Sequence, residues 1–216
     1  MAIMATDAGG GGDYNPVPQG THIAICDQVV DLGKQSIKSD KYGDSVKHQV
    51  YIRWQIPEER SQWEQDGEKK EGPAVIGKTY TVSLGDKANL RKDLQAWRGK
   101  PFTPEELKGF DIAKLLGVPA TITVTHTEKD GKTYANIASV GGIPKGMPRP
   151  TPEGDLILYD SDNLGTFEKL SKRMQDRIKA QIIDTGRTDP ADPDGWRSND
   201  GAPSGFSDDL DDDIPF

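Results

Sequence analysis

The last nine residues combine charge and apolar groups in an order that suits docking to another protein. The chain finishes in DDLDDDIPF. Aspartates create a negative field that speeds encounter with a basic pocket, and Ile-Pro-Phe supplies an apolar anchor beside an expected terminal carboxylate. A tail that served only solubility would explain the aspartates but not the aromatic residue, whose exposure is a liability unless something binds it. We therefore predict a partner-docking peptide made of Asp208, Asp209, Asp211, Asp212, Asp213, Ile214, Pro215 and Phe216.

A second group of residues pairs cations with aromatic rings in three separate segments. Cations neutralise phosphates, and rings stack on unpaired bases with a gain of about 1–3 kcal/mol per base. A single lysine in a loop is more often a solvated charge than a phosphate contact, so the repeated pairing carries the prediction. The expected nucleic-acid-binding residues are Lys34, Lys38, Lys41, Tyr42, Lys47, Tyr51, Arg53, Lys129, Lys132 and Tyr134.

No pattern in the chain predicts an enzyme. The glycine run at residues 9–12 lacks the Lys-Ser/Thr pair and the helix of a phosphate-binding loop. His22, His48 and His126 are isolated, and no Cys/His cluster has metal-ligand spacing. We expect no catalytic site, no cofactor and no metal.

Strand patterns occupy most of the first half of the chain. Residues 46–56 alternate clearly, so Ile52 and Trp54 should face the core, whereas Tyr51 and Arg53 should lie on an exposed face. Residues 33–45 and 58–72 are polar and predict loops. The expected strands are residues 21–32, 46–56, 74–84, 118–126 and 132–140, the last two joined by an Asp-Gly turn.

Helical patterns follow the third strand and the fifth. Residues 87–97 and 103–116 predict two helices, and Thr103 with Glu106 forms a capping box at the start of the second. Residues 163–183 predict another helix, with an apolar stripe that includes Phe167. Packing of this helix on the strands, with a solvated basic face, is the simpler interpretation. Binding to a partner or to a second copy is the alternative, which leaves a homo-oligomer open.

The order of these elements predicts a mainly β fold. Five strands with helices between the third and fourth match a five-stranded OB-fold barrel with a helical insertion, followed by a C-terminal helix and a disordered acidic tail. A generic α+β domain is the alternative. The expected divisions are a flexible N-terminus (1–19), an OB-fold DNA-binding domain (20–150), a helical extension (151–184), and a linker with the docking tail (185–216). OB-folds hold oligonucleotides on strands 2 and 3 and on loops 1–2 and 4–5, where the cations and rings lie.

Charge divides the chain into two regions. The formal net charge is −8, yet residues 20–150 contain 20 basic and 17 acidic side chains, whereas residues 186–216 contain nine aspartates and two arginines. Such asymmetry favours nucleic acid at one end and protein at the other. The single cysteine, Cys26, lies in a strand-like run and suits a buried position and a reducing cytoplasm. No apolar segment approaches membrane-spanning length, so we expect a cytoplasmic protein.

Two segments resemble known families. DDLDDDIPF resembles the acidic C-terminal peptide of bacterial single-stranded DNA-binding proteins, which finishes in Ile-Pro-Phe. LRKDLQAWRGKPFTPEELKGFD, with GKTYANIASV and PKGMP, is similar to a phage-encoded group of single-stranded DNA-binding proteins. The longer insertion after strand 3, the 58–72 loop and the extra helix depart from the bacterial pattern.

These resemblances imply a protein that coats single-stranded DNA during replication, recombination or repair in a bacterial host cell. They also imply that the tail recruits replication and repair proteins. A protein-binding OB-fold adaptor and a strand-annealing recombination protein are the alternatives.

Overall fold

The computed structural model describes residues 16–38, 43–65 and 68–182. Its strands are β1 (Gly20–Ile37), β2 (Ser45–Gln65), β3 (Glu68–Thr81), β4 (Pro119–Lys129), β5 (Lys132–Gly141) and β6 (Ile157–Tyr159). Its helical segments are α1 (Asn89–Arg98), α2 (Pro104–Lys108), η1 (Ile112–Leu115), η2 (Leu164–Lys169) and α3 (Lys172–Lys179). The predicted order of three strands, a helical insertion and two strands is confirmed.

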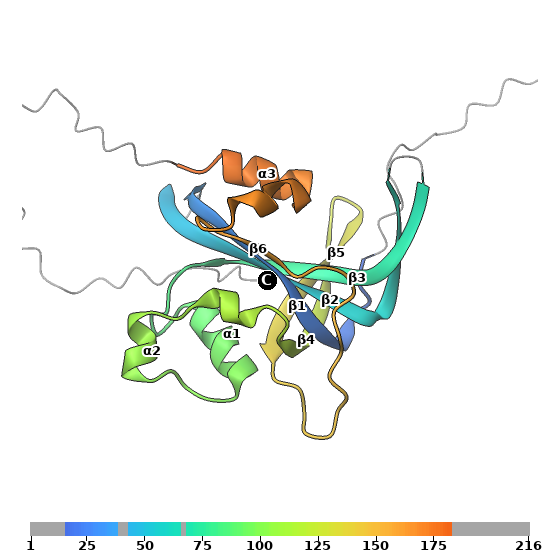
Figure 1. Cartoon of the computed structure of the whole chain (residues 1–216), viewed down its shortest axis with the longest axis horizontal. Helices are drawn as coiled ribbons and strands as arrows, with labels where there is room; N and C mark the ends of the chain where they lie inside the picture. Colours follow the sequence, from blue (N-terminus) through green and yellow to red (C-terminus); the bar gives the residue numbers. More distant parts are fainter. Residues whose placement is uncertain (1–15, 39–42, 66–67, 183–216) are drawn as a thin grey trace, which may run out of the picture.

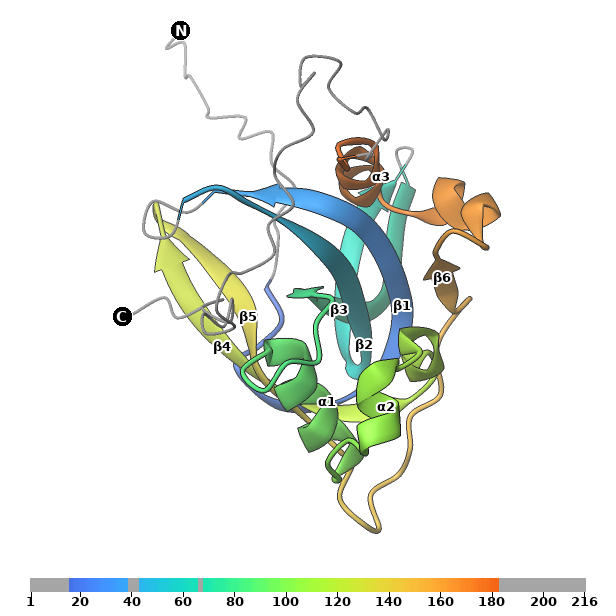
Figure 2. The ribbon, with the colours of Figure 1, turned by 90° about the vertical axis from the view of Figure 1, so that its left-hand side faces the viewer.

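Five strands form one curled antiparallel sheet in the order β3-β2-β1-β4-β5 (Figure 2). β1 holds the curl together, because its first part pairs with β4 and the rest pairs with β2. Register shifts between Cys26 and Gln28 and between Asp31 and Gly33 interrupt the β1–β2 ladder, and such bulges increase bend and twist. Among the described residues no ladder joins β3 to β5, so the sheet is a half-barrel.

The main core lies inside the curl and is closed by α1. Trp54 is 1% exposed and meets Trp97 of α1 with their ring centroids 5.5 Å apart. The Trp97 indole N–H donates to the carbonyl of Pro119 at 2.8 Å, which ties α1 to the start of β4. Cys26 is fully buried and burial raises the pKa of its thiol. Trp54, Tyr80 and Cys26 are therefore core residues, as their positions in the strand patterns predict.

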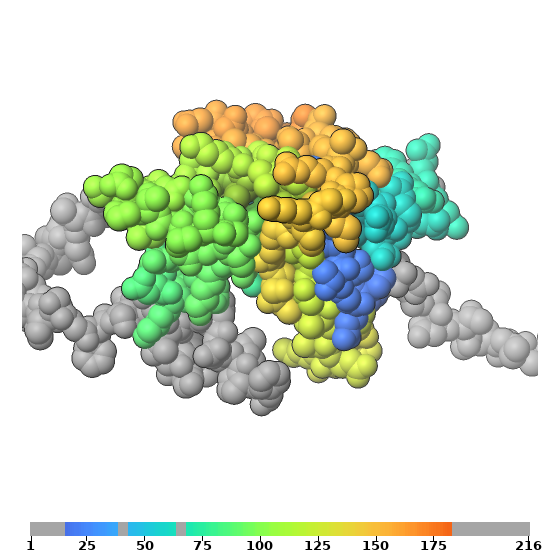
Figure 3. All heavy atoms as spheres, turned by 90° about the horizontal axis from the view of Figure 1, so that it is seen from below, coloured from blue at the N-terminus to red at the C-terminus, as the bar shows by residue number. Residues whose placement is uncertain are grey.

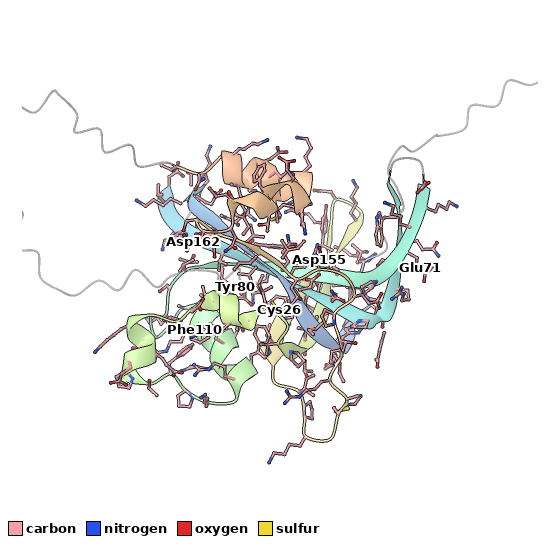
Figure 4. The ribbon with its side chains drawn as sticks, in the orientation of Figure 1. Cys26, Glu71, Tyr80, Phe110, Asp155 and Asp162 are labelled. Carbon is pink, nitrogen blue, oxygen red and sulfur yellow. The ribbon has the colours of Figure 1, made fainter. Side chains whose placement is uncertain are left out.

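Two helical layers lie on opposite sides of the sheet (Figure 1). α1 and α2 cover one side, and η2 with α3 covers the other. On the second side Met174, Ile178 and Leu170 pack against Val30 and Leu32 of β1. The predicted packing of the C-terminal helix on the strands is confirmed. Cys26 and Tyr80 lie between the two layers (Figure 4).

Two segments expected as loops are strands. β1 continues to Ile37, and β2 and β3 extend as a hairpin through most of residues 58–72. Pro57 falls where the β2–β3 register shifts, between Ile56 and Arg60. At that bulge its missing N–H removes no ladder hydrogen bond, so it does not end the strand. The prediction of loops at 33–45 and 58–72 is wrong for these parts.

The hairpin made by β2 and β3 is tied to the rest of the chain. Arg60 pairs with Glu71 at 3.4 Å and with Glu153 at 2.8 Å. Glu71 lies on the projecting end of the hairpin in Figure 4. Figure 3 shows the segment after β5 between the α1–α2 region and this hairpin.

Each of the two longer predicted helices is broken. Residues 103–116 form α2 and then η1, with the helix ending at Gly109. The Thr103–Glu106 capping box is confirmed by reciprocal hydrogen bonds of 3.3 and 2.9 Å. In residues 163–183, Leu170 adopts an extended conformation between η2 and α3 and is 4% exposed in the cluster on β1. Burial of Leu170 therefore coincides with the break. No described helix is long and apolar enough to span a membrane.

Candidate nucleic-acid interface

The sequence predicts an open outer face for β2, yet the middle of this face is covered. Tyr51 packs against the cluster formed by β1 and the C-terminal segment. Its phenol also lies across Gly77 of β3, so closely that a side chain at residue 77 would overlap it. Burial raises the pKa of the Tyr51 hydroxyl. The expectation of an exposed ring at Tyr51 is wrong, because residues more than a hundred positions later cover it.

Arg53 is held in a partly buried ion pair. Its Nε and Nη2 donate to the two carboxylate oxygens of Asp27 at 3.1 and 2.7 Å. Asp27 is 3% exposed and lies at the β1 register shift beside Cys26. Gln55 donates to the same carboxylate at 3.3 Å. Since a buried carboxylate needs a cation and hydrogen-bond donors, Arg53 neutralises Asp27 in this structure.

The predicted residues around the β1–β2 connection fall into three groups. Lys34 lies within β1 rather than in a loop, and it is exposed; Lys47 lies in β2 and is half-buried. Both have interaction partners in the structure. Lys38 is exposed directly after β1. Lys41 and Tyr42 lie outside the described residues.

The β4–β5 tip, defined here as Lys129, Lys132 and Tyr134, is open to solvent. Asp130 and Gly131 both have positive φ, 53° and 70°, as expected for the predicted Asp-Gly hairpin turn. Lys129 and Lys132 face each other across the ladder, and like charges directly opposite each other repel. Tyr134 is 44% exposed. This tip presents two cations and a ring, as the sequence predicts, and an anion bound there would relieve the repulsion.

Two arginines of α3 add charge that the sequence prediction does not assign to the interface. Arg177 donates from Nη1 to Thr79 Oγ1 at 3.0 Å and from Nη2 to Gln49 Oε1 at 2.9 Å. Burial, followed by repulsion from Arg173, lowers the pKa of Arg177. The expected solvated basic face is thus wrong for Arg177. The sequence contains a signal for the buried position of Arg177. Arg173 and Arg177 lie four residues apart, and they directly precede Met174 and Ile178, both of which are buried.

The histidines act singly. His22 donates to the carbonyl of Pro18 at 2.8 Å, His126 donates to that of Val17 at 2.7 Å, and His48 lies 2.6 Å from Asp31. Within residues 16–38, 43–65 and 68–182 no group of three or more His, Cys, Asp or Glu side chains could hold a metal ion.

The predicted docking peptide, residues 208–216, lies outside the described residues. No family model and no curated protein matches this chain.

Proposed function

We propose that this chain binds single-stranded DNA and recruits replication or repair proteins through its acidic C-terminal peptide. The observation that carries the proposal is the sequence DDLDDDIPF, which joins five aspartates to an Ile-Pro-Phe anchor. It follows a curled β domain whose residues 20–150 carry more basic than acidic side chains. The proposal assigns the chain no catalytic role and places it in the cytoplasm of a bacterial host.

The proposed fold is an OB-fold in which the half-barrel is the ligand-binding unit. The order β3-β2-β1-β4-β5, with helices between β3 and β4, supports this assignment. In OB-folds the β1–β2 and β4–β5 connections flank the oligonucleotide. Here the exposed Lys38 follows β1, and the β4–β5 tip carries Lys129, Lys132 and Tyr134. These residues form the proposed DNA contacts, since phosphates need cations and unpaired bases need a ring.

A protein-binding adaptor is the second candidate, and a specific observation favours it. The centre of the β2 face, where an OB-fold holds bases, is covered at Tyr51 and neutralised at Arg53. A domain with this face closed could use its exposed edges to bind protein while the tail docks a replication factor.

Titration with a fluorescent oligonucleotide of unstructured sequence separates the two candidates. We expect binding that weakens steeply as salt rises, with duplex DNA and RNA as competitors to define preference. Absence of salt-dependent binding by the full chain would favour the adaptor.

The recruiting half of the proposal depends on Phe216. A peptide spanning residues 207–216 should bind a replication factor, and the same peptide without Phe216 should bind more weakly by about 2 kcal/mol or more, as expected for an anchor residue. Both peptides keep all five aspartates. Equal affinity of the two peptides in a calorimetric titration would leave only nonspecific acidic attraction.

A further inference from the structure

α3 places two arginines beside the outer faces of β2 and β3. Arg177 is half-buried and hydrogen-bonds to Gln49 of β2 and Thr79 of β3. Arg173 lies one helical turn earlier and is exposed. Residues four apart lie on the same side of a helix, so the two guanidinium groups belong to one surface. The positive charges of both guanidinium groups also act to lower the pKa of the Tyr51 hydroxyl, against the larger rise caused by burial.

These two arginines differ in their partners from four of the other five described arginines; the fifth, Arg149, is exposed. Arg53, Arg60, Arg91 and Arg98 each contact a carboxylate. Within the described part of the chain, Arg173 and Arg177 contact none, and both acceptors of Arg177 are neutral. The only aspartate on α3, Asp176, pairs with Lys172 at 3.2 Å. A half-buried guanidinium without an anion is costly, and a bound anion would offset that cost.

The neutral acceptors also orient the guanidinium. Arginine has five N–H donors in a planar fork, and Gln49 and Thr79 engage one donor on each terminal nitrogen. The remaining donors can meet the oxygens of a phosphate, with Arg173 providing a second cation.

The backbone of α3 is fixed independently of these side chains. Gln35 of β1 donates to the carbonyl of Arg177 at 3.0 Å, and the N–H of Ile182 donates to the carbonyl of Lys34 at 2.8 Å. Met174 and Ile178 are 5% and 4% exposed against β1. The site is therefore built on a packed element and not on a loose helix.

We propose that Arg173 and Arg177 form a phosphate-binding site for single-stranded DNA, so that the C-terminal helix is part of the nucleic-acid surface. This proposal rests on the proposed function. It adds the surface where α3 meets β2 and β3 to the proposed DNA contacts at Lys38 and the β4–β5 tip. The competing explanation is that Arg177 only clamps α3 to the sheet.

The test is an oligo-dT titration of the full chain at several salt concentrations. Each phosphate that the protein neutralises on a single strand contributes a slope of about 0.7 to the dependence of log K on log salt, or about fivefold in affinity between 0.1 and 1 M salt. Arg173→Gln should lower the slope by about that amount. Lys172→Gln, which removes an equal charge from the same helix outside the site, should lower it by much less.

Arg177→Lys separates the phosphate site from the clamp. Lysine keeps the charge and loses the fork that bridges Gln49 and Thr79, so the salt slope should be retained while thermal stability falls. Arg177→Gln should lower both the salt slope and the thermal stability. If Arg177→Gln and Arg173→Gln change the salt slope no more than Lys172→Gln does, Arg177 only clamps α3 to the sheet. The phosphate site is then rejected, whatever the stability of these variants.

The aspartates of the tail are a second source of anions, since their carboxylates could bind Arg173 and Arg177 in place of a phosphate. A full-length variant with Asp208, Asp209, Asp211, Asp212 and Asp213 changed to Asn removes that source. In this background the effect of Arg173→Gln on the slope should persist; its disappearance would assign the site to the tail and overturn the phosphate proposal. If the unmodified chain fails to bind oligo-dT at any salt, the proposed function itself is wrong. Binding without an effect of Arg173 or Arg177 rejects this inference alone.

Discussion

The centre of the β2 outer face and the β4–β5 tip contain the same kinds of residue but differ in environment. Tyr51 and Arg53 lie in a covered region, one beneath the C-terminal segment and the other bound to Asp27. Tyr134, Lys129 and Lys132 lie in the open. A ring beside a cation therefore does not define an interface by itself. Whether such a pair can form an interface depends on two further features: whether a later segment packs on the ring, and whether a buried carboxylate binds the cation.

The comparison predicts that substitutions at the two places affect different properties. The β2 residues should contribute mainly to stability. The tip residues should contribute mainly to binding of nucleic acid.

The largest expected effect is on stability at Arg53. Arg53→Ala leaves the Asp27 carboxylate buried without its cation, and breaking a buried pair in this way costs about 3 kcal/mol. We take the low end of the usual range because the Arg53 side chain is 26% exposed. Denaturant unfolding measures the loss.

Two variants control this prediction. Adding Asp27→Asn to Arg53→Ala should recover most of the lost free energy of unfolding, because the unpaired charge is removed. Lys172→Ala, which breaks an exposed pair within α3, should cost less than about 0.5 kcal/mol. An Arg53→Ala loss as small as that of Lys172→Ala would mean that Arg53 is free for other use.

A smaller effect is expected at Gly77. Gly77→Ala puts a methyl group where the Tyr51 ring lies, and overpacking of this kind costs about 1–2 kcal/mol. Gly165→Ala is the matched control, because nothing lies within 4 Å of the added carbon there. Thermal unfolding of the two variants should show a loss for Gly77→Ala alone. Unchanged stability at both positions would show that Tyr51 is mobile and that the covered face can open.

The smallest effect on stability is expected at the tip. Lys129→Gln combined with Lys132→Gln removes two like charges that face each other, so the free energy of unfolding should change by less than about 0.5 kcal/mol. The salt slope of oligonucleotide binding should instead fall by about 0.7 for each phosphate that is no longer neutralised. A variant with full affinity and an unchanged slope would exclude the tip from the interface.

Local sequence patterns are sufficient to predict much of the fold. Strand alternation places Trp54 and Tyr80 in the core, the Asp-Gly pair locates the β4–β5 turn, and the Thr103 capping box locates the start of α2. These features depend on neighbours in the sequence or on one buried face.

The wrong predictions concern places where contacts between segments distant in the sequence determine the structure. Pro57 is tolerated because β3 and β2 shift register around it, and the helix after β6 is broken at the buried Leu170. Alternation predicts an open face for Tyr51 and Arg53 because it distinguishes two sides of a strand but not what covers them. The cover of Tyr51 comes from Ile178 and its neighbours, and the partner of Arg53 comes from a bulge in β1.

Tyrosine nitration with and without oligo-dT tests most directly whether the chain holds single-stranded DNA at its open surface. Tetranitromethane, followed by peptide mass spectrometry, reports the reactivity of each tyrosine in the full chain. We expect Tyr134, which is 44% exposed, to be modified in the free protein and protected by saturating oligonucleotide, whereas the covered Tyr51 should react slowly in both states. Equal modification of Tyr134 with and without DNA, or protection confined to Tyr51, would contradict the account.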